Sequence, residues 1–218
     1  EMCIRDRIKD EAAAHNDIVQ GNFLDTYYNL TLKGVVGLSW ISRHCPSAEM
    51  VIKIDDDVYV NVFRIVDFVL PALSGKRHQI GCPYHPAGQK PILRQGAKWG
   101  SKWTVESHIF PHLRTYPVDH CDGFFVVMTG DLIKPMLEAV RVNPFFHIDD
   151  IYMFGLLPRS VGDVKFTDLT KFVTSFVEYG QRCLKSTTCR LLAVIDDNYD
   201  RKSQDHMEML AGGGNNNL

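Results

Sequence analysis

The chain has 218 residues, a length that favours one generous domain over two small ones. Its hydrophobic fraction of 45% is enough to build a core, so the composition excludes a disordered protein. A net charge of −2 without a basic stripe argues against nucleic-acid binding. No apolar run reaches 18 residues, which excludes a membrane span within this sequence.

The first eight residues fit no element downstream, so we predict a non-native or disordered leader over 1–8. The domain is expected over 9–205, and 206–218 are expected to hold the end of a helix and a disordered, Gly- and Asn-rich tail. A short strand is predicted over 17–20. Asp25 is then placed to cap a helix running to about Ser42, with apolar residues at helical spacing at Tyr28, Leu32, Val35, Val36 and Trp40.

The most informative stretch is an apolar, β-branched run, Met50–Ile54, that ends in the three adjacent carboxylates Asp55, Asp56 and Asp57. The run predicts a strand buried on both faces. Because side chains alternate along a strand, Asp55 and Asp57 are expected on one side and Asp56 on the other. Like charges this close repel unless they face water or a cation, and oxygen donors suit Mg²⁺ or Mn²⁺. A solvated strand end is the alternative interpretation.

One further helix and a long irregular segment follow. Asn61 is placed to cap a helix that ends near Ser74-Gly75. From His78 to Tyr116 the sequence is rich in Pro and Gly, and a loop this long is usually functional or mobile. It carries aromatic and basic side chains suited to the apolar face of a sugar, although a small core under the loop explains them equally well: Lys98, Trp99, Lys102 and Trp103.

The second half predicts a strand over 124–128, a helix beginning at 129 or 131, and a short apolar helix entered by Asp149 and Asp150. Carboxylates at a helix start gain from the helix dipole, but a carboxylate far from a metal cluster is also typical of a general base. A last strand is predicted over 189–195. Six cysteines leave free thiols and disulfides equally open, with Cys183 and Cys189 as the most plausible local pair.

These motifs, in this order, resemble the β-1,3-galactosyltransferase group, glycosyltransferase family 31. The resemblance covers about 15–195 and is most specific in its first half, over Asp25–Lys33, Trp40, Cys45 and Lys53–Asn61. It continues more loosely in Lys102-Trp103, Tyr116-Pro117, Gly123–Val126 and Asp149–Tyr152.

The resemblance implies an α/β fold of GT-A type, with a Rossmann-like, mostly parallel central sheet flanked by helices. It implies an inverting, metal-dependent hexosyltransferase that moves galactose, or an N-acetylhexosamine, from a UDP-sugar to a glycan hydroxyl and forms a β-1,3 linkage. Mn²⁺ or Mg²⁺ is the implied cofactor and a glycan on a glycoprotein or glycolipid the implied acceptor. The full-length protein is expected in the Golgi lumen as a type II membrane protein, anchored outside this chain.

Site residues follow from the positions that match the family's motifs. Asp150 matches the catalytic base, Asp57 and Asp55 the metal ligands, and Asp55, Asp56 and Lys53 the nucleotide-binding segment. Acceptor binding is expected from Trp103, Tyr116, Asp122 and Gly123.

The sequence departs from the family pattern in four places. The family's first nucleotide-binding segment is missing, so the chain looks truncated at its start. Asp149 replaces the usual Glu, and Asp122 replaces a small residue. Asp196 and Asp197 stand where a metal-binding His is usual, and Asp196 is a candidate replacement ligand. These departures keep open a catalytically weakened glycan- or nucleotide-binding relative; a two-metal phosphoesterase is a weaker alternative, because the sequence supplies few further ligands.

Overall fold

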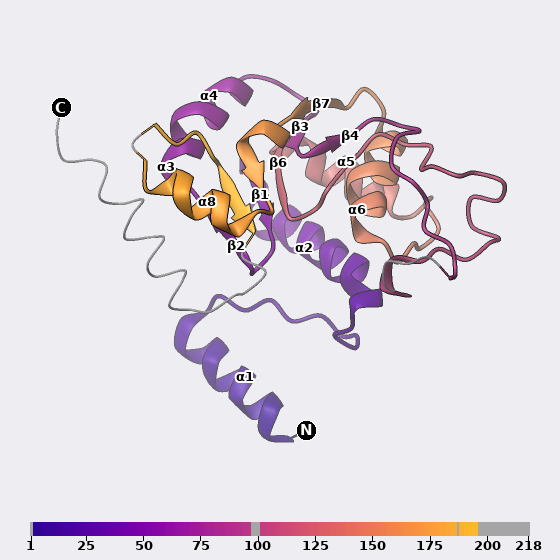
Figure 1. Ribbon diagram of the computed structural model, residues 1–218. Helices are drawn as coiled ribbons and strands as arrows, with labels where there is room; N and C mark the ends of the chain where they lie inside the picture. The colour runs from indigo at the N-terminus through magenta and orange to yellow at the C-terminus, as the bar shows by residue number, and fades with distance from the viewer. Residues whose placement is uncertain (1, 97–100, 187, 196–218) are drawn as a thin grey trace.

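The computed structural model describes residues 2–96, 101–186 and 188–195. Predictions for Lys98, Trp99, Asp196, Asp197 and the tail from 206 lie outside these residues. Within them, helices pack on both faces of a mixed sheet (Figure 1). No helix of the described part is both long and apolar enough to cross a bilayer.

The main sheet has the strand order β1-β6-β3-β7, formed by Met50–Ile54, Phe125–Thr129, Gln79–Cys82 and Lys165–Asp168. β6 pairs antiparallel with both β1 and β3, whereas β3 and β7 are parallel. The expectation of a mostly parallel sheet is therefore wrong for the described residues. The reason is local: the backbone N–H of Asp55 donates to the carbonyl of Phe124, so β6 begins beside the end of β1 and must run back along it.

Strand β6 is one of the two inner strands of the main sheet. All five of its residues are buried, with Val126 and Met128 facing one core cluster and Phe125 and Val127 facing the other. β1, which we expected to be buried on both faces, is instead an edge strand of the described sheet, with its outer residues Ile52 and Ile54 exposed by 40% and 46%. An apolar run alone does not distinguish an edge strand from a central one.

The remaining strands of the described residues form two smaller sheets. One has the order β2-β9-β8, over Val58–Val60, Ala193–Ile195 and Val173–Thr174. The other pairs β4 (Tyr84–His85) with β5 (His120–Cys121). The strand predicted over 17–20 does not form, and the predicted last strand is shortened to β9.

Helices on one face of the main sheet enclose the larger core. α2 packs against α5, and α5 against α7. The helical segments of this layer are η1 (Tyr27–Asn29), α2 (Leu30–His44), η4 (Gly130–Leu132), α5 (Ile133–Ala139), α6 (Asp149–Ile151), η5 (Tyr152–Leu156) and α7 (Leu157–Val161). The predicted buried face of α2 is only partly right, because Tyr28 and Trp40 are exposed and Leu38 is buried in their place.

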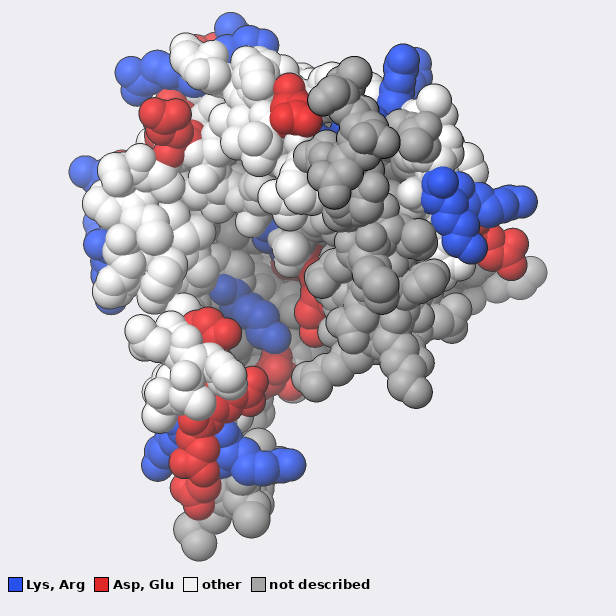
Figure 2. Space-filling model, turned by 90° about the vertical axis from the view of Figure 1, so that its left-hand side faces the viewer, with Lys and Arg blue, Asp and Glu red and all other residues white. Residues whose placement is uncertain are grey.

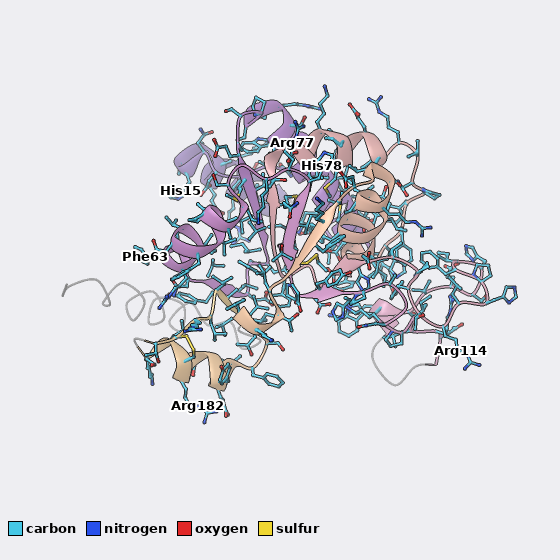
Figure 3. All side chains as sticks on the ribbon, turned by 90° about the horizontal axis from the view of Figure 1, so that it is seen from above. His15, Phe63, Arg77, His78, Arg114 and Arg182 are labelled. Atoms are coloured by element: carbon cyan, nitrogen blue, oxygen red, sulfur yellow. A yellow bond between two sulfur atoms is a disulfide. The ribbon has the colours of Figure 1, made fainter. Side chains whose placement is uncertain are left out.

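The opposite face is covered by the continuous helical run α3, η2 and α4, over Val62–Arg64, Ile65–Val69 and Leu70–Leu73. Asn61 caps it as predicted, since its side-chain oxygen accepts from the N–H of Arg64 at 3.1 Å. The buried residues Ile65, Val69 and Leu73 face the sheet, whereas Phe63 lies on the outer side with 53% of its surface exposed (Figure 3).

Three short helical elements remain, η3 (Ser101–Trp103), η6 (Thr170–Phe172) and α8 (Val177–Leu184). Residues 2–15, expected in part to be a disordered leader, form helix α1 (Met2–His15), which projects from the body of the protein (Figure 1). Figure 2 shows acidic and basic side chains side by side on this helix and in the hollow above it. The domain boundaries stay predictions.

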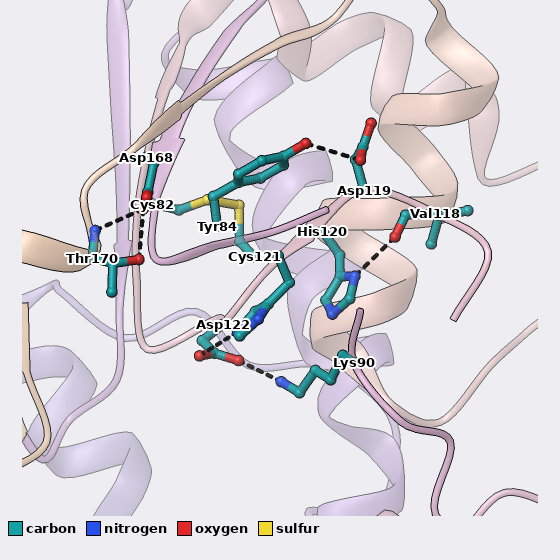
Figure 4. The surroundings of a disulfide bond; sticks show 11 residues. Cys82, Tyr84, Lys90, Val118, Asp119, His120, Cys121, Asp122, Asp168 and Thr170 are labelled. Atoms are coloured by element: carbon teal, nitrogen blue, oxygen red, sulfur yellow. Dashed lines mark hydrogen bonds and ion pairs between the residues drawn. A yellow bond between two sulfur atoms is a disulfide. The ribbon is translucent and has the colours of Figure 1, made fainter. Parts of the chain in front are cut away.

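Two disulfides are present among the described residues, Cys82–Cys121 and the predicted local pair Cys183–Cys189. Cys82–Cys121 joins the end of β3 to β5, directly before Asp122 and Gly123 (Figure 4). Both sulfurs belong to residues with no exposed surface. The bond therefore fixes the turn on which the site residues described below are carried.

Loop length predicts a difference between the two disulfides. Their partners are separated by 39 and 6 residues, and a longer closed loop restricts the unfolded chain more strongly. We expect the double variant Cys82→Ala/Cys121→Ala to lose about 3–4 kcal/mol of unfolding free energy in urea titrations. Cys183→Ala/Cys189→Ala is the control and should lose less; an equal or greater loss there would contradict this account.

Candidate active site

The carboxylates that the sequence analysis identified lie at one end of the strands of the main sheet. The carboxyl end of β1 leads into Asp55, the amino end of β6 is preceded by Asp122 and Gly123, and α6 begins with Asp149 and Asp150. In α/β proteins the carboxyl ends of strands are where ligand crevices form. Segments about 70 and 95 residues apart in the sequence therefore meet at one place.

The aspartate triple lies in a turn rather than on the strand. The N–H of Val58 donates to the carbonyl of Asp55 at 3.3 Å, which closes a turn between β1 and β2. Asp55 and Asp57 are half-buried and Asp56 is exposed. The burial of the three side chains therefore agrees with the prediction that Asp56 differs from Asp55 and Asp57. The difference arises from the turn and not from the alternation of side chains along a strand.

Lys53 forms hydrogen bonds to residues of two segments that meet here, Asp55 after β1 and Gly123 before β6. Its ammonium group donates to the carboxylate of Asp55 and, at 2.6 Å, to the carbonyl oxygen of Gly123. Burial and the negative charge of Asp55 raise the pKa of Asp149 above its usual range. The positive charge of Lys53 acts in the opposite direction and lowers this pKa. Lys53 therefore partly compensates a site rich in negative charge.

Asp150 is held against the backbone of Gly123. A Cβ atom built on Gly123 would lie 2.1 Å from a carboxylate oxygen of Asp150, so only glycine leaves room for this carboxylate. Burial, and then the adjacent charge of Asp149, raise the pKa of Asp150 to about 7, against the opposing effects of Lys90 and Lys53. A carboxylate with a pKa near neutrality is well suited to take a proton from a hydroxyl group.

The close contact at Gly123 predicts a loss of function without a loss of fold. Gly123→Ala must displace the carboxylate of Asp150, and a misplacement of this size costs roughly 100-fold in rate. Initial-rate assays of the sugar transfer that the family resemblance implies would measure this loss. Gly37→Ala is the matched control, because an added Cβ there meets nothing within 4 Å; a similar loss in both variants would remove Gly123 from the site.

The raised pKa of Asp150 also predicts a pH-dependent cost in stability. Because the folded state holds this proton more tightly than the unfolded state, the contribution of Asp150 to stability is intact below about pH 4 and is lost as pH rises toward 7. Asp150→Asn removes the ionisation and should be more stable than the starting protein at pH 7–8, by at most about 4 kcal/mol. Urea titrations from pH 4 to 8 test this; a constant difference across that range would contradict it.

The carboxylate of Asp122 contacts two side chains on the far side of Gly123, His85 and Lys90. His85 Nε2 lies 2.8 Å from one carboxylate oxygen, and the ammonium group of Lys90 contacts the other (Figure 4). Although burial acts to raise the pKa of Asp122, Lys90 and His85 hold it below the usual range. Neither Lys90 nor His85 was predicted, because nothing in the sequence links them to a residue more than 30 positions away.

The predicted acceptor residues divide into two groups. Trp103 is 39% exposed, and Asp122 and Gly123 lie beside Asp150. Tyr116 is instead buried, with 4% of its surface exposed, and packs edge-on against Phe110 and Phe146. The Tyr116 ring thus packs in the core, and its part in acceptor binding stays a prediction.

The metal prediction rests on two carboxylates of the turn, Asp55 and Asp57. Within the part of the chain that the structure describes, no three His, Cys, Asp or Glu side chains come together as a metal site. Two carboxylates with the oxygens of a bound diphosphate and water are nevertheless a donor set that Mg²⁺ uses, and the oxygen chemistry fits Mn²⁺ as well.

Comparison with known proteins identifies the class to which this arrangement belongs. The family model described as galactosyltransferase matches residues 1–169. The chain therefore belongs to the galactosyltransferase family, as the resemblance indicated.

Individual relatives agree with this assignment. β-1,3-Galactosyltransferase 2 of Mus musculus is 32% identical over 146 residues, which cover 67% of this chain and 33% of the relative. β-1,3-Galactosyltransferase 5 of Homo sapiens is 33% identical over 152 residues, covering 70% and 46%. A third relative, acetylgalactosaminyl-O-glycosyl-glycoprotein β-1,3-N-acetylglucosaminyltransferase of Mus musculus, is 31% identical over 166 residues, covering 73% and 40%. The chain thus spans a third to nearly half of the length of these relatives.

Proposed function

We propose that this chain is the catalytic part of an inverting hexosyltransferase of GT-A type. It transfers galactose, or an N-acetylhexosamine, from a UDP-sugar to a glycan hydroxyl and forms a β-1,3 linkage. The observation that carries the proposal is the carboxylate of Asp150, half-buried against Gly123 with its pKa raised to about 7, beside the turn that holds Asp55. The names of the relatives support the class of reaction and leave the donor sugar open.

Each residue of the site has a part in this reaction. Asp150 takes the proton from the acceptor hydroxyl while the oxygen of that hydroxyl forms a bond to the anomeric carbon of the donor sugar. At the same time the bond between the anomeric carbon and the diphosphate breaks on the opposite face of the sugar. One displacement inverts the anomeric centre, so an α-linked donor gives a β-glycoside. Lys53 holds Asp55 beside Gly123. It thereby keeps the turn between β1 and β2, here called the donor turn, close to the base Asp150.

A divalent cation, Mn²⁺ or Mg²⁺, fits the donor side of the site. Asp57 and Asp55 would hold it, together with oxygens of the substrate diphosphate. When bound, such a cation neutralises the charge that gathers on the departing diphosphate. Lys53 already contacts Asp55, so cation binding there requires this ion pair to rearrange or Asp55 to act through water.

The alternative is a relative that binds nucleotide or glycan without turnover. The observation in its favour is that the described residues contain no group of three His, Cys, Asp or Glu side chains that could hold a metal ion. Such a protein has no use for a carboxylate whose burial costs stability, and for this reason we favour the enzyme.

The test is direct. The purified chain is incubated with Mn²⁺, one of UDP-galactose, UDP-N-acetylglucosamine or UDP-N-acetylgalactosamine, and p-nitrophenyl glycosides as acceptors, and products are detected by mass spectrometry. A disaccharide product that requires both donor and metal supports the proposal. UDP binding without product for any donor would favour the binding relative.

We also propose an oxidising compartment, the Golgi lumen, with the full-length protein held as a type II membrane protein by a segment outside this chain. The two disulfides support the compartment, because such bonds persist in secretory environments. A tagged full-length protein that co-fractionates with Golgi membranes and resists protease until detergent is added would support it. A protein released by salt washing would contradict it.

A further inference from the structure

A second cluster borders the carboxylates and consists of Tyr27, Lys102 and Trp103. The indole N–H of Trp103 donates to the hydroxyl oxygen of Tyr27, and the two rings meet edge to face with centroids 6.3 Å apart. The ammonium group of Lys102 lies 4.5 Å from the centre of the Tyr27 ring and 4.4 Å from that of Trp103. Two segments 76 residues apart are thereby joined through side chains alone.

This cluster adjoins the site already described. Burial is the main cause of the rise in the pKa of Tyr27 to about 12, and the negative charges of Asp149, Asp150 and Asp55 add to it. The Tyr27 hydroxyl is therefore within electrostatic reach of both the proposed base and the donor turn. Trp103 is linked to this group through the hydrogen bond that its indole N–H donates to the Tyr27 hydroxyl.

The two segments that meet here are independently anchored. Beside Tyr27, Thr31 at the start of α2 donates its hydroxyl to the carbonyl of Phe146 at 2.7 Å, three residues before Asp149. On the other side, the guanidinium group of Arg94 donates to the carbonyls of Glu106 at 2.7 Å and Ile109 at 2.9 Å and so pins the loop that carries Trp103. The Tyr27 hydroxyl accepts a hydrogen bond from the indole N–H and so constrains the orientation of the Trp103 ring.

We propose that Tyr27 is a positioning residue for the acceptor: its hydroxyl holds the half-exposed indole of Trp103 as a platform on which the apolar face of an acceptor hexopyranoside lies beside Asp150. This inference rests on the proposed function and assigns Tyr27 a part in it. Trp103 has 39% of its surface exposed, and exposed indole surface is suited to the C–H face of a pyranose, whose hydroxyls remain free for polar partners. Lys102 adds a positive charge that contacts both rings.

The experiment compares Tyr27→Phe with Tyr28→Phe in the full chain. Both keep the aromatic ring and lose one hydroxyl, but Tyr28 is half-exposed and packs against His147 instead of Trp103. We measure kcat and KM for a p-nitrophenyl glycoside acceptor at saturating donor, and the affinity for UDP. Binding of methyl β-glycosides of N-acetylglucosamine, galactose and N-acetylgalactosamine in the presence of UDP is followed by ligand-observed NMR.

Tyr27→Phe is expected to raise the acceptor KM about five-fold, the effect of one hydrogen bond, with kcat and UDP affinity unchanged and Tyr28→Phe equal to the starting protein. An unchanged acceptor KM, or an equal loss of kcat and UDP affinity, overturns the inference. If the starting protein transfers no sugar, the proposed function is wrong. The positioning role of Tyr27 is then tested by glycoside binding alone. Weaker glycoside binding by Tyr27→Phe than by Tyr28→Phe then supports it, and equal or absent binding overturns it.

Discussion

Asp150→Asn is expected to lower sugar transfer by about 10²–10⁴-fold while UDP binding stays unchanged. The amide has the shape of the carboxylate and fits the same space against Gly123, but it cannot take the proton of the acceptor hydroxyl. Steady-state transfer assays at saturating donor measure the first effect, and calorimetric UDP titration the second.

Asp149→Asn is the matched comparison for this variant. Asp149 is adjacent, half-buried and also has a raised pKa, yet Asp150 is the carboxylate in contact with Gly123. If Asp149→Asn loses more activity than Asp150→Asn, the base has been assigned to the wrong member of the pair. A parallel loss of UDP affinity in Asp150→Asn would instead indicate a role in donor binding.

Asp57→Ala is expected to weaken Mn²⁺-dependent UDP binding by about 100-fold or more, because changes in the second shell of a metal site alone cost 10–100-fold. The half-buried Asp57 belongs to the turn that follows β1 and is our principal proposed metal ligand. Calorimetric titration of UDP into the protein with Mn²⁺, and again with a chelator, measures the effect.

Asp67→Ala serves as the control for this change. Asp67 is an exposed carboxylate on the outer helical run and has the same charge as Asp57. UDP binding that persists in Asp57→Ala with the same dependence on Mn²⁺ would show that the cation is held elsewhere. Binding that never depends on the metal in the starting protein would remove the cation from the account.

The sequence predicts the acidic clusters well because their signals are local. Three aspartates after a short apolar run, and an acidic pair before a helical one, are visible without any tertiary information. Asn61 as a helix cap and Cys183–Cys189 as a local pair are confirmed for the same reason. Family resemblance then supplied what local reasoning could not, namely that the two clusters belong to one site.

Other features depend on contacts that the sequence does not encode locally. β1 is an edge strand and β6 an inner one, although both are short β-branched runs of similar composition. Tyr116 was expected at the acceptor because its neighbourhood matches the family, but its ring is taken up by the core. Lys90 is recognised only when the fold brings it to Asp122, and the contact between Tyr27 and Trp103 likewise appears only in the fold.

The central claim is that one displacement, with Asp150 as base, inverts the anomeric centre. The most direct measurement is NMR of the product formed from an α-linked UDP-hexose and the acceptor glycoside that the screen identifies, recorded as the reaction proceeds. We expect a newly formed β-1,3 glycoside as the first product, and none with Asp150→Asn. An α-glycoside, or a β-glycoside formed at an undiminished rate by Asp150→Asn, would contradict it.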